Sequence, residues 1–191
     1  MSLPDRTLAL NILRAHRASS DAELLTLALE TLASGQRYLA YELLRAAPRA
    51  LTAARVKDVR RFAVGMTTWS DVDCFGCFVA GVAWRTGRIS DKEIARFASS
   101  IDRWWRRAAL VATVPLNAKS RGATSATGDA KRTLAVCTQL LDDQDDMVVK
   151  AMSWALRELA KRNPRAVRTF LSEHAERLTA RVRREVTNKL T

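Results

Sequence analysis

The stretch KAMSWALRELAKRNP, residues 150–164, decides the fold that this chain is expected to adopt. It begins with a basic residue, continues through alanine into an apolar stripe, and stops at a proline. The same order recurs in RYLAYELLRAAP (37–48) and in RRAALVATVP (106–115). The spacing of the three copies is irregular, so they do not form a strict array. Helix pairs stacked into a short, curved α-solenoid fit this pattern best.

The rest of the chain follows the same helical periodicity, with strand-like alternation almost absent and with only seven glycines and four prolines. Helices are predicted over residues 4–17, 21–33, 36–46, 51–65, 70–86, 91–98, 101–113, 130–141, 146–162, 165–172 and 179–189. The small, polar stretch NAKSRGATSATGD (117–129) is predicted to be a mobile loop. We therefore expect a single all-α domain over residues 1–191.

The charge of the chain indicates what it binds. Its 191 residues include 32 Lys and Arg against 20 Asp and Glu, a net charge of +12. Such an excess favours a polyanionic partner, of which nucleic acid is the commonest, and a basic concave solenoid face suits a duplex. The alternative is a soluble protein from an arginine-rich proteome. With no apolar run of transmembrane length, no secretory pattern and three cysteines that cannot all pair, we expect a cytoplasmic protein.

The predicted helix 146–162 carries a tryptophan on its basic side. Its core stripe consists of Val148, Met152, Ala155, Leu156 and Leu159. Trp154 points about 140° away from that stripe at the helical period. Its neighbours on that side are Lys150, Arg157, Glu158 and Lys161. The alternatives to an exposed functional ring are packing against the next helix pair or cover by lysine stems.

The predicted helix 70–86 carries a carboxylate opposite its core. Phe75, Phe78, Val79 and Val82 form the core side, and Asp73 faces away. Around Asp73 lie Trp69, Gly76, Cys77, Ala80, Gly81 and Trp84. The start of the helix should favour ionised Asp73. The alternative is a capping box, in which Asp73 only bonds back to Ser70.

Three further patterns are weaker. In the predicted helix 101–113 the expected core residues are Ile101, Trp105, Ala108 and Ala112. Arg107 lies on the opposite face, beside Arg103 and Trp104. This face is either a phosphate clamp or a solvated basic surface. The acidic run LDDQDDM (141–147) is expected to be a loop and a helix start. The CFGC motif (74–77) lacks a second ligand pair, so no zinc or redox site is expected.

Three motifs in order, TTWSDVDCFG (67–76), DRWWRRAALVATV (102–114) and the opening stretch, resemble the AlkD family of bacterial DNA alkylation repair glycosylases. The likeness covers roughly residues 36–190. The resemblance implies an α-solenoid of HEAT-like helix pairs with a basic concave groove for duplex DNA. Trp69 and Asp73 match the family's W-x-x-x-D, Arg107 matches its W-x-x-R, and Trp154 matches its later tryptophan.

The resemblance also implies the chemistry. Asp73 would stabilise the oxocarbenium-like sugar and position water, Trp69 and Trp154 would flank the sugar, and Arg107 would grip a phosphate. Further DNA contacts are expected from Arg103, Trp104, Lys150, Arg157 and Lys161. No metal or cofactor is implied, and a monomer is expected.

Two alternatives remain beside this enzyme. One is a catalytically silent HEAT-like protein that binds DNA, for instance branched DNA, and the other is a protein–protein scaffold. The family's N-terminal DNA-binding segment has no clear match in residues 1–35, which favours the binding protein.

Overall fold

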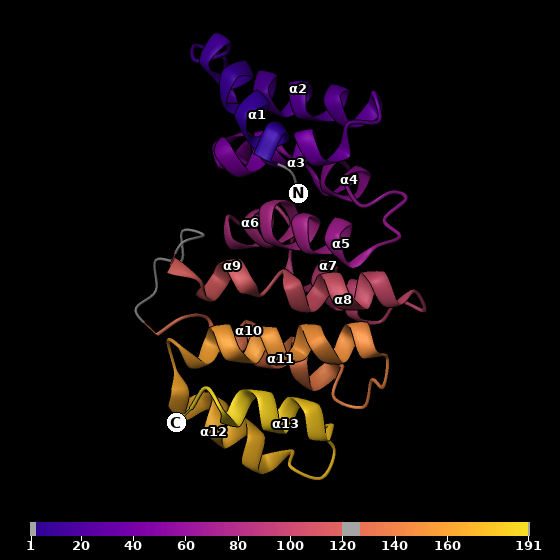
Figure 1. Ribbon diagram of the computed structural model, residues 1–191, viewed down its shortest axis with the longest axis vertical. Helices are drawn as coiled ribbons and strands as arrows, with labels where there is room; N and C mark the ends of the chain where they lie inside the picture. Colours follow the sequence, from indigo (N-terminus) through magenta and orange to yellow (C-terminus); the bar gives the residue numbers. More distant parts are fainter. Residues whose placement is uncertain (1–2, 120–126, 191) are drawn as a thin grey trace. The chain divides into compact units, whose positions relative to one another are not determined.

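The computed structural model describes residues 3–119 and 127–190 (Figure 1). These residues form helices and no strand, so the prediction of an all-α fold is confirmed. The predicted loop 117–129 falls partly outside the described residues. Two compact units are present, Met1–Ser90 and Asp91–Thr191. The prediction of one domain, like that of a curved solenoid with a concave groove, stays a prediction.

The first unit is built around one central helix. Its elements are α1 (Leu3–Ala15), α2 (Asp21–Ala33), α3 (Arg37–Ala46), a 3-10 helix (Pro48–Ala53), α4 (Val56–Arg61), α5 (Trp69–Phe75), a π-helical segment (Gly76–Ala80) and α6 (Gly81–Arg85). Helix α3 contacts α1, α2, α5 and the π-helical segment. The first unit therefore places the start of α5 against α3.

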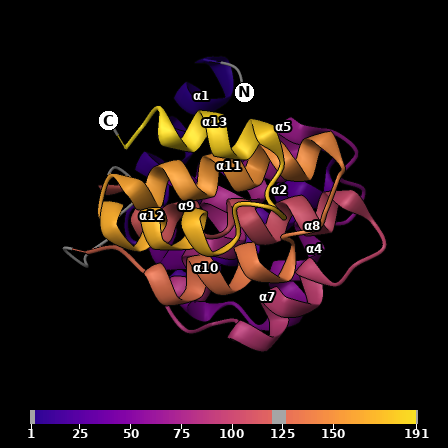
Figure 2. The same ribbon diagram turned by 90° about the horizontal axis from the view of Figure 1, so that it is seen from below.

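The second unit stacks its helices in pairs. Its elements are α7 (Asp91–Ala98), α8 (Arg103–Val111), α9 (Val114–Asn117), α10 (Ala130–Gln139), α11 (Asp146–Ala160), α12 (Pro164–Glu173) and α13 (Ala180–Thr187). Helix α7 packs on α8, and α10 and α12 pack on α11. Helix α11 also packs on α8 and on α13, and Figure 2 shows α13 lying along α11. Such stacking of successive pairs is the packing of an α-solenoid.

Polar side chains decide where most helices begin. Each one accepts a hydrogen bond from a backbone N–H of the first turn, which is otherwise without a partner. They are Ser20, Thr68, Asp102, Asp129, Asp145, Asn163 and Thr179. The predicted helix 51–65 is wrong, because the chain is extended at Ala54 and separates the 3-10 helix from α4. Helix α9 was not predicted.

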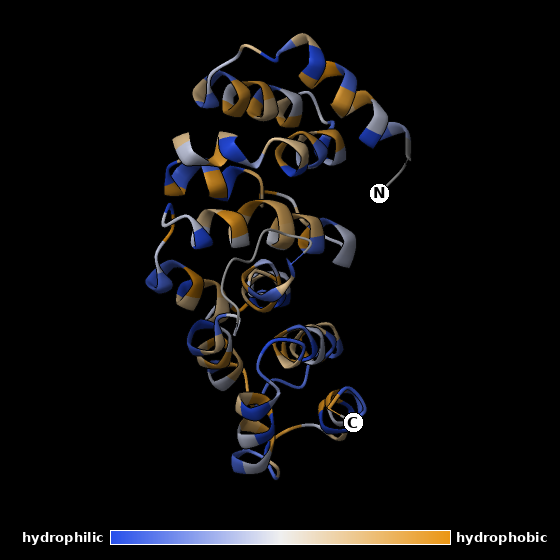
Figure 3. Ribbon diagram, turned by 90° about the vertical axis from the view of Figure 1, so that its left-hand side faces the viewer, coloured by the Kyte–Doolittle hydropathy of each residue, from blue (hydrophilic) through white to orange (hydrophobic). Residues whose placement is uncertain are grey.

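The core confirms one predicted stripe and corrects two others. All five core residues predicted for 146–162 are buried. Ile101, by contrast, is fully exposed because the cap residue Asp102 starts α8 after it. Trp84 is 2% exposed and Phe78 only half-buried, so the sides of the helix 69–85 are not those expected. Figure 3 shows hydrophobic and hydrophilic residues mixed around the helices of each unit.

Candidate functional site

The cap of helix α5 is Thr68, two residues before Ser70, the cap in the alternative box of Ser70 and Asp73. The Thr68 hydroxyl accepts a hydrogen bond from the Asp71 N–H at 3.2 Å, and an Asp71 carboxylate oxygen accepts from the Thr68 N–H at 3.1 Å. The capping box therefore joins Thr68 to Asp71. The interpretation of Asp73 as the partner of a Ser70 cap is wrong.

Asp71 is held as a structural carboxylate. It is buried, and the Tyr38 hydroxyl of α3 donates to it at 2.8 Å while Thr67 N–H donates at 3.2 Å. Burial works to raise the pKa of Asp71, but the hydrogen bonds from Tyr38, Thr67 and Thr68 outweigh it and lower that pKa overall. Asp71 thus stays ionised and ties α5 to α3.

Asp73 and Trp69 lie on one side of α5. They are one helical turn apart, a spacing that brings side chains together. The Trp69 side chain is prominent, with 59% of the residue exposed, and Asp73 is half-buried. Because α5 begins at Trp69, Asp73 stands in its second turn, beyond the strongest field of the helix start. The pair offers an aromatic face next to a carboxylate that does not cap the helix.

Trp154 stands on α11 next to a buried polar network. The residue is half-buried. The neighbouring Ser153 is fully buried, and its hydroxyl donates to a Glu185 oxygen of α13 at 2.5 Å. Arg157 Nε donates to the Ser153 carbonyl at 3.2 Å. The hydrogen bond from Ser153 lowers the pKa of Glu185, so the contact is charge-assisted and fixes α11 against α13.

Arg107 does not lie on a solvated surface. Only 6% of the residue is exposed, and its Nη1 donates to the Met147 carbonyl oxygen at 2.5 Å. That carbonyl belongs to the first turn of α11, so Arg107 connects α8 to α11. The solvated-surface alternative is wrong for Arg107, and its predicted role as a phosphate clamp stays a prediction.

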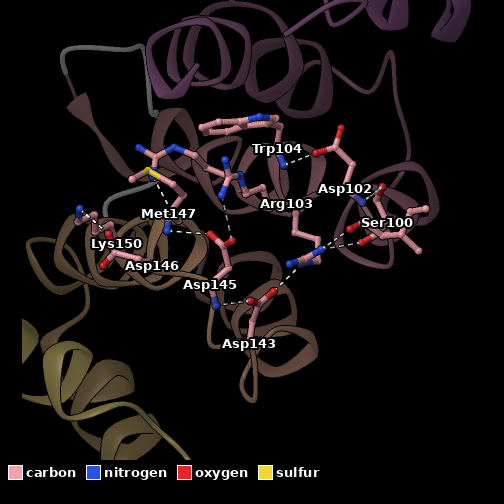
Figure 4. Close-up of polar contacts among 12 residues, drawn as sticks. Ser100, Asp102, Arg103, Trp104, Asp143, Asp145, Asp146, Met147 and Lys150 are labelled. Carbon is pink, nitrogen blue, oxygen red and sulfur yellow. Dashed lines mark hydrogen bonds and ion pairs between the residues drawn. The ribbon is translucent and has the colours of Figure 1, made fainter. Parts of the chain in front are cut away.

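The other predicted DNA-binding residues of this unit have partners within it. Arg103 lies over the Trp104 ring at 4.8 Å from its centre, and its Nη1 is 3.7 Å from Asp145 (Figure 4). Lys150 Nζ is 2.6 Å from Asp146. Lys161 Nζ is 2.5 Å from a Glu158 oxygen.

The acidic run 141–147 does more than start a helix. Asp145 caps α11 as expected, accepting from the Met147 N–H at 2.9 Å. Its aspartates also hold Arg106, Arg177 and Arg181, none of which was a candidate before. The only signal in the sequence is four aspartates within five residues of a strongly basic chain.

The cysteine motif is part of the core. Cys74 and Cys77 are buried, and burial raises the pKa of Cys74 to about 12, which leaves a neutral thiol. Across the described ranges no cluster of His, Cys, Asp and Glu could hold a metal ion. Within those same ranges no helix has the length and apolarity to cross a membrane.

A comparison with known protein families places these motifs in a wider context. The family model described as "DNA alkylation repair enzyme" matches residues 3–190, nearly the whole chain. No curated protein sequence matches the chain.

Proposed function

The chain belongs to the family of DNA alkylation repair enzymes, and we propose that it is a monofunctional glycosylase that excises positively charged N3- or N7-alkylated purines from duplex DNA. Membership of this family indicates a role in DNA alkylation repair, with DNA as the substrate. The observation that carries the glycosylase is the arrangement at the start of α5. There the capping box joins Thr68 to Asp71, and the carboxylate of Asp73 lies outside that box, one helical turn after exposed Trp69.

The proposed reaction uses that carboxylate for charge. Alkylation at N3 or N7 places a positive charge on the purine, which makes the base a good leaving group. As the bond from C1′ to the base breaks, positive charge develops on the deoxyribose, and a water oxygen then bonds to C1′. Ionised Asp73 stabilises this cation and positions the water. The products are a neutral free base and an abasic site, and the water releases one proton.

The aromatic residues and the basic residues have separate parts in this proposal. Trp69 and Trp154 hold the sugar by aromatic contact, because their π faces favour positive charge. Arg107 contacts a phosphate in this proposal because it matches the family motif. Its hydrogen bond to the Met147 carbonyl supports a second role, that of positioning α8 on α11. Phosphates are contacted by the remaining candidates, which are Arg103, Trp104, Lys150, Arg157 and Lys161. The reaction needs no metal or cofactor, and the protein acts as a monomer with HEAT-like repeats.

A DNA-binding protein without catalysis is the second candidate. The observation that favours it is the Arg107 guanidinium, which is buried on a backbone carbonyl rather than presented to a phosphate. In that case the net charge of +12 would serve binding alone, for instance to branched DNA.

Release of 7-methylguanine from methylated duplex DNA separates the two candidates. Wild type and Asp73→Asn are assayed in parallel, with 3-methyladenine as a second lesion. Release by wild type alone would establish the glycosylase and the role of Asp73. If neither protein releases either base while DNA binding remains salt-sensitive, the binding protein is correct.

A further inference from the structure

Four aspartates of the run Asp142 to Asp146 hold five basic side chains of the second unit. The residues come from α8, α11, α13 and the segment before α13, and Figure 4 shows the α8 and α11 part of this cluster. The pairs, with their shortest distances, are Arg177–Asp142 (2.5 Å), Arg106–Asp143 (2.6 Å), Arg103–Asp145 (3.7 Å), Lys150–Asp146 (2.6 Å) and Arg181–Asp146 (2.6 Å).

One of these pairs is built into the structure. The Asp143 side chain is 10% exposed and that of Arg106 is 21% exposed. Arg106 Nη1 also donates to the backbone carbonyls of Ser100 and Ile101, at 3.1 and 2.8 Å. Asp143 accepts from the Asp145 N–H at 2.9 Å. This pair fixes the loop before α11 to the loop before α8, and neither partner is available to a ligand.

The cations of the other pairs face the solvent, and so do their aspartates except Asp145, whose side chain is 23% exposed. The Asp146 side chain is 56% exposed, and its cations Lys150 and Arg181 are 42% and 39% exposed. Asp142 and Arg177 are exposed to a similar or greater extent. Solvent-exposed ion pairs contribute little to stability, because water and salt screen them. These pairs can therefore exchange partners without unfolding the chain.

The geometry of the exposed pairs is that of a phosphate contact. Arg177 donates to both oxygens of Asp142, from Nε at 3.0 Å and from Nη2 at 2.5 Å, which is the two-pronged way in which guanidinium groups hold phosphates. Asp146 receives one cation on each of its oxygens, as the two unbridged oxygens of a phosphodiester would. Hydrogen bonds from Arg177 and Lys150 lower the pKa of Asp142 and Asp146 respectively, so both carry full charge at neutral pH.

We propose that the exposed cations of this cluster form a phosphodiester-binding surface, and that the aspartates bound to them are internal substitutes for phosphates, which DNA displaces. The cations are Arg103, Lys150, Arg177 and Arg181, and the substitutes are Asp142, Asp145 and Asp146. The proposal rests on the proposed function, because it requires DNA as the ligand. A phosphate that binds here must first replace a carboxylate. Undamaged DNA is consequently held less tightly than the positive charge of the chain would dictate.

Binding of an unmodified duplex tests the proposal without any catalytic step. Affinity of the full chain is measured by fluorescence anisotropy between about 50 and 300 mM salt, where phosphate contacts dominate. Asp146→Asn releases Lys150 and the Nη1 of Arg181, whose Nε stays bound to Glu185 at 3.0 Å. It should tighten binding about fivefold at the lowest salt, the scale of one or two exposed ion pairs. The matched control is Glu173→Gln on α12, which is exposed and changes the net charge equally. It should change affinity less than about twofold, because only the general field of the protein acts there.

A second set of variants identifies the cations. Arg181→Ala and Lys150→Ala together, in the Asp146→Asn background, should abolish the gain in affinity. Asp143→Asn should not tighten binding, because Arg106 stays bound to two carbonyl groups.

Three results decide the outcome. In the first result, Asp146→Asn and Glu173→Gln change DNA affinity equally, or the gain in affinity survives the loss of both Lys150 and Arg181. If wild type still binds DNA and excises the base, this result overturns the inference and leaves the proposed function standing. Salt-sensitive binding with no excision by wild type would refute the glycosylase. The DNA affinities of the variants relative to wild type would then still decide the inference. Absence of salt-sensitive DNA binding by wild type would refute both.

Discussion

Two helices of this molecule carry an aspartate in the first turn and use it differently. Helix α5 has Thr68 as its cap and Asp71 in its first turn, and α11 has Asp145 as its cap and Asp146 in its first turn. Asp71 is buried and satisfied by a hydroxyl group and backbone N–H groups, whereas Asp146 is exposed and satisfied by partly exposed cations. An aspartate in the first helical turn thus gives one fixed carboxylate, in a capping box, and one exposed carboxylate that can be exchanged. The difference comes from the partner on another helix, which is the Tyr38 hydroxyl for Asp71 and the Arg181 guanidinium for Asp146.

The largest effect is expected at Asp73, two residues after the fixed carboxylate. Asp73→Asn should lower excision at least about 100-fold, because it removes preorganised charge from the developing cation. Folding and DNA affinity should remain, since the capping box of Thr68 and Asp71 is untouched. Excision assays together with thermal unfolding check this. A stable Asp73→Asn protein with wild-type excision would exclude Asp73 as the catalytic carboxylate.

Replacing the fixed carboxylate should have the opposite profile. Asp71→Asn should cost about 2 kcal/mol of unfolding free energy, because a buried group loses charge-assisted hydrogen bonds. The lowered pKa of Asp71 means that its stabilisation is present above the ordinary value of 3.8 and is lost as the pH falls below it. Urea unfolding of wild type and Asp71→Asn at about pH 6 and at about pH 3 should therefore show that the difference in unfolding free energy between them is smaller in acid. A gap that is constant with pH would mean that Asp71 is not bound as an ion.

The bond between α8 and the start of α11 is a smaller test. Arg107→Ala should lower the unfolding free energy by about 1 to 2 kcal/mol, because the Met147 carbonyl loses a charged donor. Lys150→Ala, which removes an exposed cation nearby, serves as the control and should leave stability unchanged. Equal stability of the two variants would show that Arg107 contributes through DNA alone.

The smallest effects are expected at the start of α11 itself. Asp145→Ala should cost about 1 kcal/mol and Asp145→Asn almost nothing, because asparagine is an equally good cap. Asp146→Asn should leave the unfolding free energy unchanged while it alters DNA affinity. Chemical unfolding of the three variants decides the point. A clear loss of stability in Asp146→Asn would make that carboxylate structural, like Asp71.

Sequence reasoning succeeded where periodicity acts alone. It placed α7 at residues 91–98 and the buried stripe of α11 correctly. It failed at the start of α5 because the capping pattern is ambiguous there. Thr68 with Asp71 and Ser70 with Asp73 have the same spacing, and the Tyr38 hydroxyl, thirty-three residues away, helps to hold the pair that forms. The aspartate pairs of the second unit were invisible for the same reason, since Arg177 and Arg181 stand thirty-five residues from their partners.

The π-helical segment explains one further failure and has a consequence for the history of the chain. Gly81 N–H bonds to the Gly76 carbonyl five residues back, so the helix carries the equivalent of one inserted residue. The π-helical turn absorbs that residue, so each later residue lies about 100° from the position that an uninterrupted helical period predicts. Trp84, which a regular helix would place beside Asp73, is thereby turned into the core. Relatives that lack the insertion should align with a one-residue gap between Gly76 and Gly81, and deleting a residue there from this chain should remove the π-helical segment and leave Trp84 in the core.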